Sequence, residues 1–200
     1  LGPEQPYSSP APPSIAHLAL GAMFFLVFSS MWSGRHHLKA VWRKAWRGDD
    51  SVDDSDELLS YRVAIFGLLG GLVLGTTWLY LSNMGLLTAV VFQLSALIIF
   101  VGLARIIAQA GLAYGVAPVA APVLTVNILG TSLLGPAGIS MLGLNFAWAA
   151  DIRTFVMASA ANGLKLAEEQ LGRGKRGLFW AMALAIAVSL VTSIATVLHL

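Results

Sequence analysis

Long apolar runs without a single Lys or Arg are the main pattern along this chain. No Lys or Arg occurs from Val63 to Ala104 or from Ile106 to Ile152, and the runs 14–34 and 178–200 are equally apolar. A helix that crosses about 30 Å of hydrocarbon needs roughly 20 such residues. The pattern therefore predicts an all-α fold, a polytopic transmembrane helical bundle with about six membrane segments.

The positions of the basic residues predict how the segments are arranged. Lys and Arg collect in cytoplasmic loops near the membrane, and one topology places all twelve of them on or near one side. Its order is a Pro-rich non-cytoplasmic segment (1–13), a span (14–34), a cytoplasmic amphipathic helix with an acidic loop (35–62), a transmembrane hairpin (63–104), broken or re-entrant segments (105–161), a cytoplasmic linker (162–177) and a last span (178–200). We expect a turn of the hairpin at 82–85.

The region from 106 to 161 is apolar but repeatedly interrupted by Gly and Pro, including the pair Gly135-Pro136. Both ends of this region carry basic residues, so it must cross the membrane an even number of times. Two crossings, roughly 118–134 and 139–158, satisfy that parity. The alternative is a pair of re-entrant segments, which irregular backbone can form only where protein or a water-filled cavity covers it.

The segment 35–47 alternates apolar and basic positions at helical spacing. Its pattern predicts an amphipathic helix in the headgroup layer, with Trp42, Arg43 and Trp46 as lipid-interface residues. The plainer interpretation is a topology anchor without a specific lipid site. The acidic residues that follow it from 49 to 57 do not match a calcium loop. We expect them to form a solvated, flexible loop that counterbalances the charge of the basic helix.

Glycines stand four residues apart at Gly67, Gly71 and Gly75. This spacing puts them on one helix face and favours close helix packing. The pattern leaves open whether the partner helix lies in this chain or in another copy.

Polar residues in and beside the broken region are the candidates for a substrate or ion pathway. They are Arg105, Gln109, Asn127, Asn145 and Asp151. Broken membrane helices expose backbone groups that can bind a solute or an ion near the midplane, and an intramembrane carboxylate such as Asp151 is a functional candidate by default. The alternative is that these groups satisfy contacts between helices and that the glycines and prolines only kink them.

Composition removes several other functions. The chain has no cysteine, 57% hydrophobic and 11% charged residues, and a net charge of +2. Disulfides, thiol nucleophiles and nucleic-acid binding gain no support from these values. Because no hydrolase, nucleotide-binding or metalloprotease motif is present, we expect no enzyme, no catalytic residue, no cofactor and no metal site.

Three short motifs carry a family resemblance: Arg105-Ile-Ile-Ala-Gln-Ala-Gly111, Asp151-Ile-Arg153 and Asn162-Gly-Leu-Lys165-Leu-Ala-Glu168. Together with Gly34-Arg-His-His-Leu38 and Leu59-Ser-Tyr-Arg62, they resemble a family of uncharacterised bacterial membrane proteins related to the oligopeptide transporter superfamily. Members of that family are longer, so the resemblance implies that this chain is a C-terminal-half segment.

The resemblance implies a secondary transporter in the bacterial inner membrane, with proton-coupled uptake of peptides or metal chelates as the precedent. The chain departs from the family at Gln109, where an acidic residue is usual, so proton coupling through this position is not expected. The alternative is a non-transporting membrane subunit or scaffold of a larger complex. The expected partners are the lipid bilayer, the rest of the polypeptide or other membrane subunits, and a second copy in a homo-oligomer.

Overall fold

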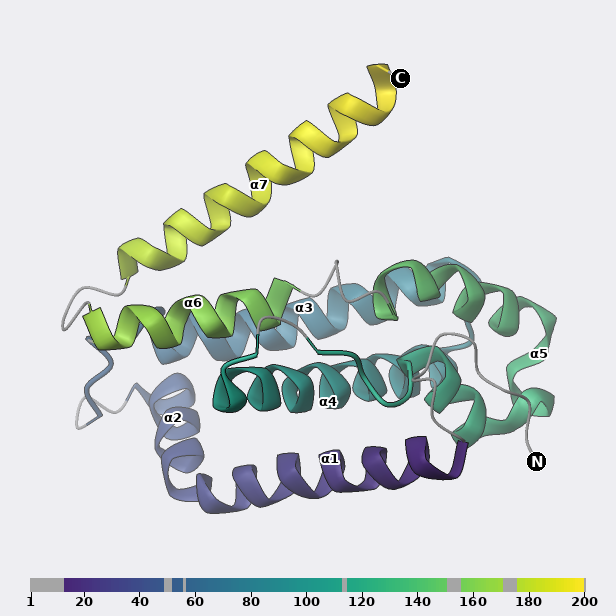
Figure 1. Cartoon of the computed structure of the whole chain (residues 1–200), viewed down its shortest axis with the longest axis horizontal. Coiled ribbons are helices and arrows are strands. Elements are labelled where there is room, and N and C mark those ends of the chain that lie inside the picture. The colour runs from purple at the N-terminus through teal and green to yellow at the C-terminus, as the bar shows by residue number, and fades with distance from the viewer. Residues whose placement is uncertain are drawn as a thin grey trace.

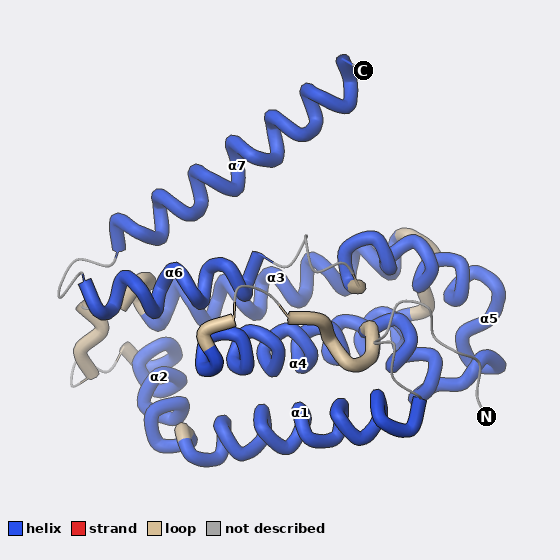
Figure 2. The backbone as a smooth tube through the Cα atoms, viewed as in Figure 1, coloured by secondary structure: helices blue, strands red, loops and turns tan. Residues whose placement is uncertain are grey.

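The computed structural model describes residues 13–48, 52–55, 57–112, 115–150, 156–170 and 176–199. These residues form helices joined by loops and contain no strand (Figures 1 and 2). The helices are α1 (Pro13–Ser33), α2 (Arg35–Arg47), α3 (Tyr61–Leu81), α4 (Leu86–Ala110), α5 (Ala121–Ala149), α6 (Val156–Gln170) and α7 (Arg176–His199). The predicted all-α class is confirmed.

Five of the described helices, α1, α3, α4, α5 and α7, are long and apolar enough to cross a membrane. The sequence predicts about six membrane segments. The count differs because a single interrupted helix, α5, covers most of the two crossings expected at 118–134 and 139–158, and residues 156–158 belong to the next helix, α6. The first arm of α5 begins later than predicted and its second arm ends earlier, at Ala149.

Helix α4 is the centre of the bundle and contacts α1, α3, α5 and α6. A stripe of buried apolar side chains on α1, which includes Met23 and Val27, faces α4. The stripe meets Gly102, where an added Cβ atom would lie 2.7 Å from Met23 Cγ and 3.0 Å from Val27 Cγ2. Only a residue without a side chain therefore fits at this contact.

Helices α3 and α4 form the predicted hairpin. The turn contains Asn83 in a left-handed conformation (φ 67°) and the buried Met84. Along the hairpin, Thr76 Oγ1 donates a hydrogen bond to Gln93 Oε1 at 2.8 Å, and Gly75 makes room for the same Gln93 side chain. The hairpin thus joins two continuous helices by one polar contact in an apolar interface.

Helix α5 is interrupted at two glycines. Gly130 (φ 73°, ψ 158°) and Gly135 (φ 63°, ψ 174°) both leave the helical region, and they do so in a part of φ/ψ space that is essentially restricted to glycine. The chain reverses between them, so the arms 121–129 and 136–149 form a bent pair (Figure 1). Each arm is shorter than the roughly 20 residues that one membrane crossing requires.

An irregular segment leads from α4 back into the bundle before α5 begins (Figure 2). It packs tightly on α4, since an added Cβ atom at Gly115 would lie 3.3 Å from side-chain atoms of Leu103 and Ile107. Helix α6 is held to the same end of α4, where Asn162 Nδ2 donates to Leu112 O at 2.8 Å and Lys165 Nζ donates to Ala108 O at 2.6 Å.

Helix α7 differs from the other long helices because none of its residues is buried. It projects away from the bundle (Figure 1). An apolar helix in this position must be covered by lipid or by another helix, because leaving its side chains in water costs free energy.

Candidate functional site

The two inner ends of α5 lie beside the middle of α4. At the end of the second arm, the Trp148 ring lies 5.5 Å from Phe92 and 6.2 Å from Phe100. At the start of the first arm, Ala120 and Ala121 are buried, and no side chain caps the helix there. The start of α5 therefore lies within the core of the bundle. The last turn of the second arm packs one face against α4 and leaves Ala147 and Trp148 exposed.

Buried polar side chains accompany these helix ends. Thr125 is fully buried and its Oγ1 donates to Ala121 O at 2.9 Å. In the second arm, Asn145 Nδ2 donates to Met141 O at 2.8 Å and Asn145 Oδ1 accepts from Trp148 Nε1 at 2.6 Å. The Thr125 and Asn145 side chains are both buried, and each is hydrogen-bonded within its own arm of α5.

Asn127 is exposed, and its Nδ2 atom lies 3.3 Å from Nε2 of His17 in the first turns of α1. The contact joins residues that are far apart in the sequence. It lies at the end of α1 opposite α2, so Asn127 belongs to the end of the bundle that the basic residues avoid.

Arg105 and Gln109 lie in the last two turns of α4 and are exposed. Since α3 begins beside α2 and α4 returns along α3, these residues lie at the α2 end of the bundle, away from Asn127. The structure therefore does not bring the predicted pathway residues together in one cluster. Asp151 lies outside the described residues.

The three predicted packing glycines of α3, Gly67, Gly71 and Gly75, form a stripe that contacts another helix at one end only. Gly75 lies against Gln93 of α4, whereas Gly67 and Gly71 have no atom of another described element within 4 Å of an added Cβ. Of these three glycines, only Gly75 therefore takes part in close helix packing within the described chain. The rest of the stripe faces outward.

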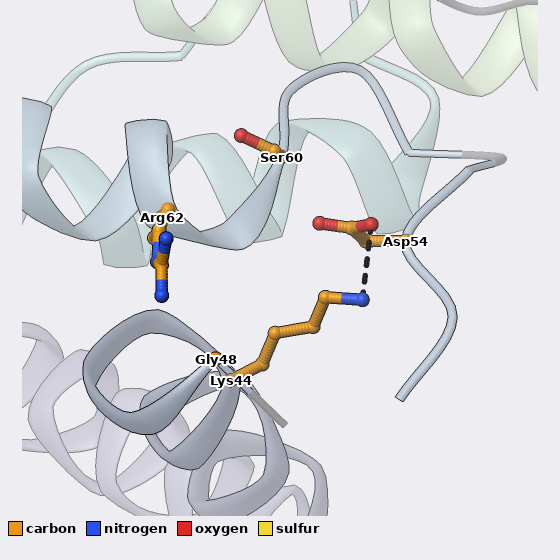
Figure 3. Close-up of a pocket in the computed structure, with 5 residues that line it drawn as sticks. All are labelled: Lys44, Gly48, Asp54, Ser60 and Arg62. Carbon is orange, nitrogen blue, oxygen red and sulfur yellow. Dashed lines mark ion pairs between the residues drawn. The ribbon is translucent and has the colours of Figure 1, made fainter. Parts of the chain in front are cut away.

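Helix α2 has the predicted amphipathic form, and the acidic loop is bound to it. Lys44 Nζ forms an ion pair with Asp54 Oδ1 at 3.3 Å, in a pocket lined by Gly48, Ser60 and Arg62 (Figure 3). The backbone N–H of Tyr61, at 3.1 Å from Asp54 Oδ2, and the nearby Lys44 lower the pKa of Asp54. In the described part of the loop, Asp54 is thus paired with the basic helix α2, while Asp53, Ser55 and Glu57 are exposed.

Two side chains that make polar contacts with the sequence candidates, Trp148 with Asn145 and His17 with Asn127, were not predicted. Trp148 stands three residues after Asn145, a spacing that puts both on one helix face, so its contact could have been predicted. His17 interrupts an apolar run, but nothing in the sequence indicates that it meets Asn127.

Five apolar helices of membrane length, four of them in a bundle centred on α4, define an integral membrane protein of the all-helical class. Within that class, the chain belongs to the family of unknown function DUF6785, which matches residues 4–200. No curated protein and no solved structure matches the chain.

Proposed function

We propose that this protein is part of a secondary transporter and that the interrupted helix α5 lines its solute pathway. The observation that carries the proposal is the backbone at Gly130 and Gly135. A helix of this length could cross the bilayer without interruption. It instead reverses at two glycine-only conformations and returns its end to the middle of α4.

Helix ends inside a bundle support this function for a physical reason. The first N–H groups and the last C=O groups of a helix have no partner within the helix, and they carry partial positive and negative charge. In membrane transporters, discontinuous helices use such ends to bind solutes and ions near the midplane. The buried Thr125 and Asn145 add side-chain polarity about one helical turn from the two inner ends of α5.

The proposed topology is multi-pass in the inner (plasma) membrane, with α2 and the C-terminal end of α4 on the cytoplasmic side. The positive-inside rule supports it. Peptides and metal chelates are the proposed substrate classes, and this part rests on the resemblance to the oligopeptide transporter superfamily alone. Because Gln109 is neutral, we place ion coupling at Asp151.

The test is uptake into proteoliposomes that contain the protein, with labelled alanine tripeptide and ferric citrate as the two probes. Gly130→Ala and Asp151→Asn should each abolish most of the uptake, whereas Gly71→Ala, a change in an open part of α3, should leave it intact. For both probes, equal uptake by liposomes with and without the protein would contradict these substrate classes. Full uptake by the Gly130 variant would remove α5 from the pathway.

A second candidate function is a non-transporting membrane subunit that packs against other chains. The outward-facing Gly67 and Gly71 and the unburied α7 favour it, since both offer an apolar surface to a partner. Native mass spectrometry of the protein extracted from its own membrane separates the two. Stoichiometric unrelated subunits support the scaffold, whereas the protein alone or a self-associated species supports the transporter.

A further inference from the structure

Helix α2 carries two parallel stripes of side chains, one apolar and one basic. Within each stripe the residues are spaced by four, so they lie along the helix axis in two neighbouring rows. The apolar row is Leu38, Trp42 and Trp46, and the basic row is Lys39, Arg43 and Arg47. All six residues are exposed, and together they line one shallow groove.

The opposite side of α2 is fixed to the rest of the molecule, so the stripes have a defined direction. Ala45 is buried and its carbonyl oxygen accepts from Arg62 Nε at 3.3 Å. The His37 ring meets Tyr61 edge to face at 5.9 Å. These contacts, together with the ion pair of Lys44, hold α2 against the start of α3.

The aromatic part of the groove is already ordered. Trp42 and Trp46 stack at 5.7 Å with nearly parallel rings, and Trp46 stacks on Phe66 in the second turn of α3 at 5.8 Å. The apolar row therefore continues onto a membrane-length helix. A ligand in the groove would meet a preformed aromatic wall on one side and three cations on the other.

The position of α2 indicates what occupies this groove. Helix α2 runs across the end of α1 (Figure 1), separated from it by Gly34 alone. Across this junction, the Arg35 guanidinium lies 5.2 Å from the centre of the Trp32 ring, a pairing suited to the boundary between apolar and polar layers. An amphipathic helix at this depth buries its apolar face among acyl chains and points its cations at lipid phosphates.

We infer that this groove binds the headgroup phosphate of an anionic phospholipid, with Lys39, Arg43 and Arg47 on the phosphate and Trp42 and Trp46 beside the glycerol and upper acyl chains. Charge complementarity selects an anionic lipid over a zwitterionic one, because the basic row carries three positive charges. The carboxylates of Asp54 and Glu57 contact Lys44 and Tyr61, and neither lines the groove. This site is independent of the proposed transport function.

The test is a native mass spectrometry titration of the detergent-solubilised protein with phosphatidylglycerol and, separately, with phosphatidylcholine. Each Lys or Arg near a lipid surface contributes about a factor of five in affinity for anionic lipid. The triple variant Lys39→Gln/Arg43→Gln/Arg47→Gln should therefore lose at least about tenfold in affinity for phosphatidylglycerol. Its affinity for phosphatidylcholine should stay the same.

A matched control removes the same charge elsewhere. Arg105→Gln/Lys165→Gln/Arg176→Gln takes three cations from other parts of the protein. It should leave phosphatidylglycerol affinity within about twofold, because none of the three lines the groove and salt screens distant charges. Trp42→Ala/Trp46→Ala should weaken both lipids. Should the triple variant fail to fold, Arg43→Gln alone should still cost about three- to fivefold for phosphatidylglycerol only.

Three results would overturn the inference. The first is equal affinity of the unchanged protein for the two lipids. The second is an equal loss in the basic-row variant and in the control, which would indicate net charge alone. The third is full displacement of phosphatidylglycerol by millimolar inorganic phosphate, which would indicate a site for free phosphate and not for a lipid.

Discussion

The α3–α4 hairpin and the interrupted helix α5 have similar apolar compositions but different backbones. Both contain several glycines. In α3 the glycines keep helical geometry and the helix continues, whereas Gly130 and Gly135 of α5 take positive φ and the helix reverses. Apolar composition therefore decides which parts of this chain lie in the bilayer. The conformation of two glycines decides which part has helix ends in its interior.

The largest expected effect comes from giving those two glycines a side chain. Gly135→Ala should lower the free energy of unfolding by about 1–3 kcal/mol, because only glycine takes this conformation without strain. Thermal unfolding in detergent, followed by tryptophan fluorescence, measures the change. The comparison is Gly71→Ala in the helical part of α3, which should be neutral or stabilising by up to about 1 kcal/mol. Equal effects at the two positions would mean that α5 is not interrupted.

A second change tests the packing of the continuous helices. Gly102→Ala puts a Cβ atom 2.7 Å from Met23 Cγ, and an overpacked contact of this kind costs about 1–3 kcal/mol. Thermal unfolding again reports the loss. The double variant Gly102→Ala/Met23→Ala removes the opposing side chain and should recover part of it. Additive losses in the double variant would contradict the contact between α1 and α4.

Asn145→Leu tests the polar contacts at the inner end of α5. The change leaves Trp148 Nε1 without its acceptor, which we expect to cost about 1 kcal/mol since Trp148 itself is partly accessible. A shift in tryptophan fluorescence should accompany the loss. The corresponding change in the hairpin, Gln93→Leu, should cost less, because polar contacts between membrane helices average about 0.6 kcal/mol.

The smallest effect concerns the ion pair that fixes α2 to α3. The pKa of Asp54 is lowered in the folded protein, so its contribution is present at pH values above the ordinary carboxyl pKa of about 3.9 and is lost as the pH falls through the lowered value. Asp54→Asn should remove at most about 1 kcal/mol at pH 7. Unfolding curves from pH 7 to pH 3 should converge for the two proteins only at the acid end.

The parts of the fold that follow from local chemistry were predictable. Uncharged apolar runs identify α1, α3, α4 and α7, and alternating apolar and basic positions identify α2. The break at Gly135 also has a local cause, because the residue before a proline avoids the helical region and Pro136 can begin a new helix without an N–H group. The second break, at Gly130, has no neighbour that signals it.

The contacts between distant segments were not predictable. Nothing local indicates that Gly115 packs on α4, that Met23 faces Gly102, or that His17 meets Asn127. The pathway candidates were chosen because they are polar in an apolar region. That criterion finds Asn145, which is buried in the interrupted helix, but also Arg105 and Gln109, which lie at the other end of the bundle from Asn127. Polarity in an apolar segment therefore identifies residues that need a polar contact. Only the packing of the helices shows which of these residues lie together.

The most direct test of the account is the accessibility of two introduced cysteines, which the absence of native cysteine makes unambiguous. Gly143 in the second arm of α5 and Gly71 in α3 are both helical, exposed and free of neighbours within 4 Å of an added Cβ. A difference in labelling between them therefore reports whether water or lipid surrounds each position. A membrane-impermeant maleimide applied to the protein in sealed membranes should label Gly143→Cys and leave Gly71→Cys unmodified. Labelling of neither or of both would contradict a solute pathway along the interrupted helix.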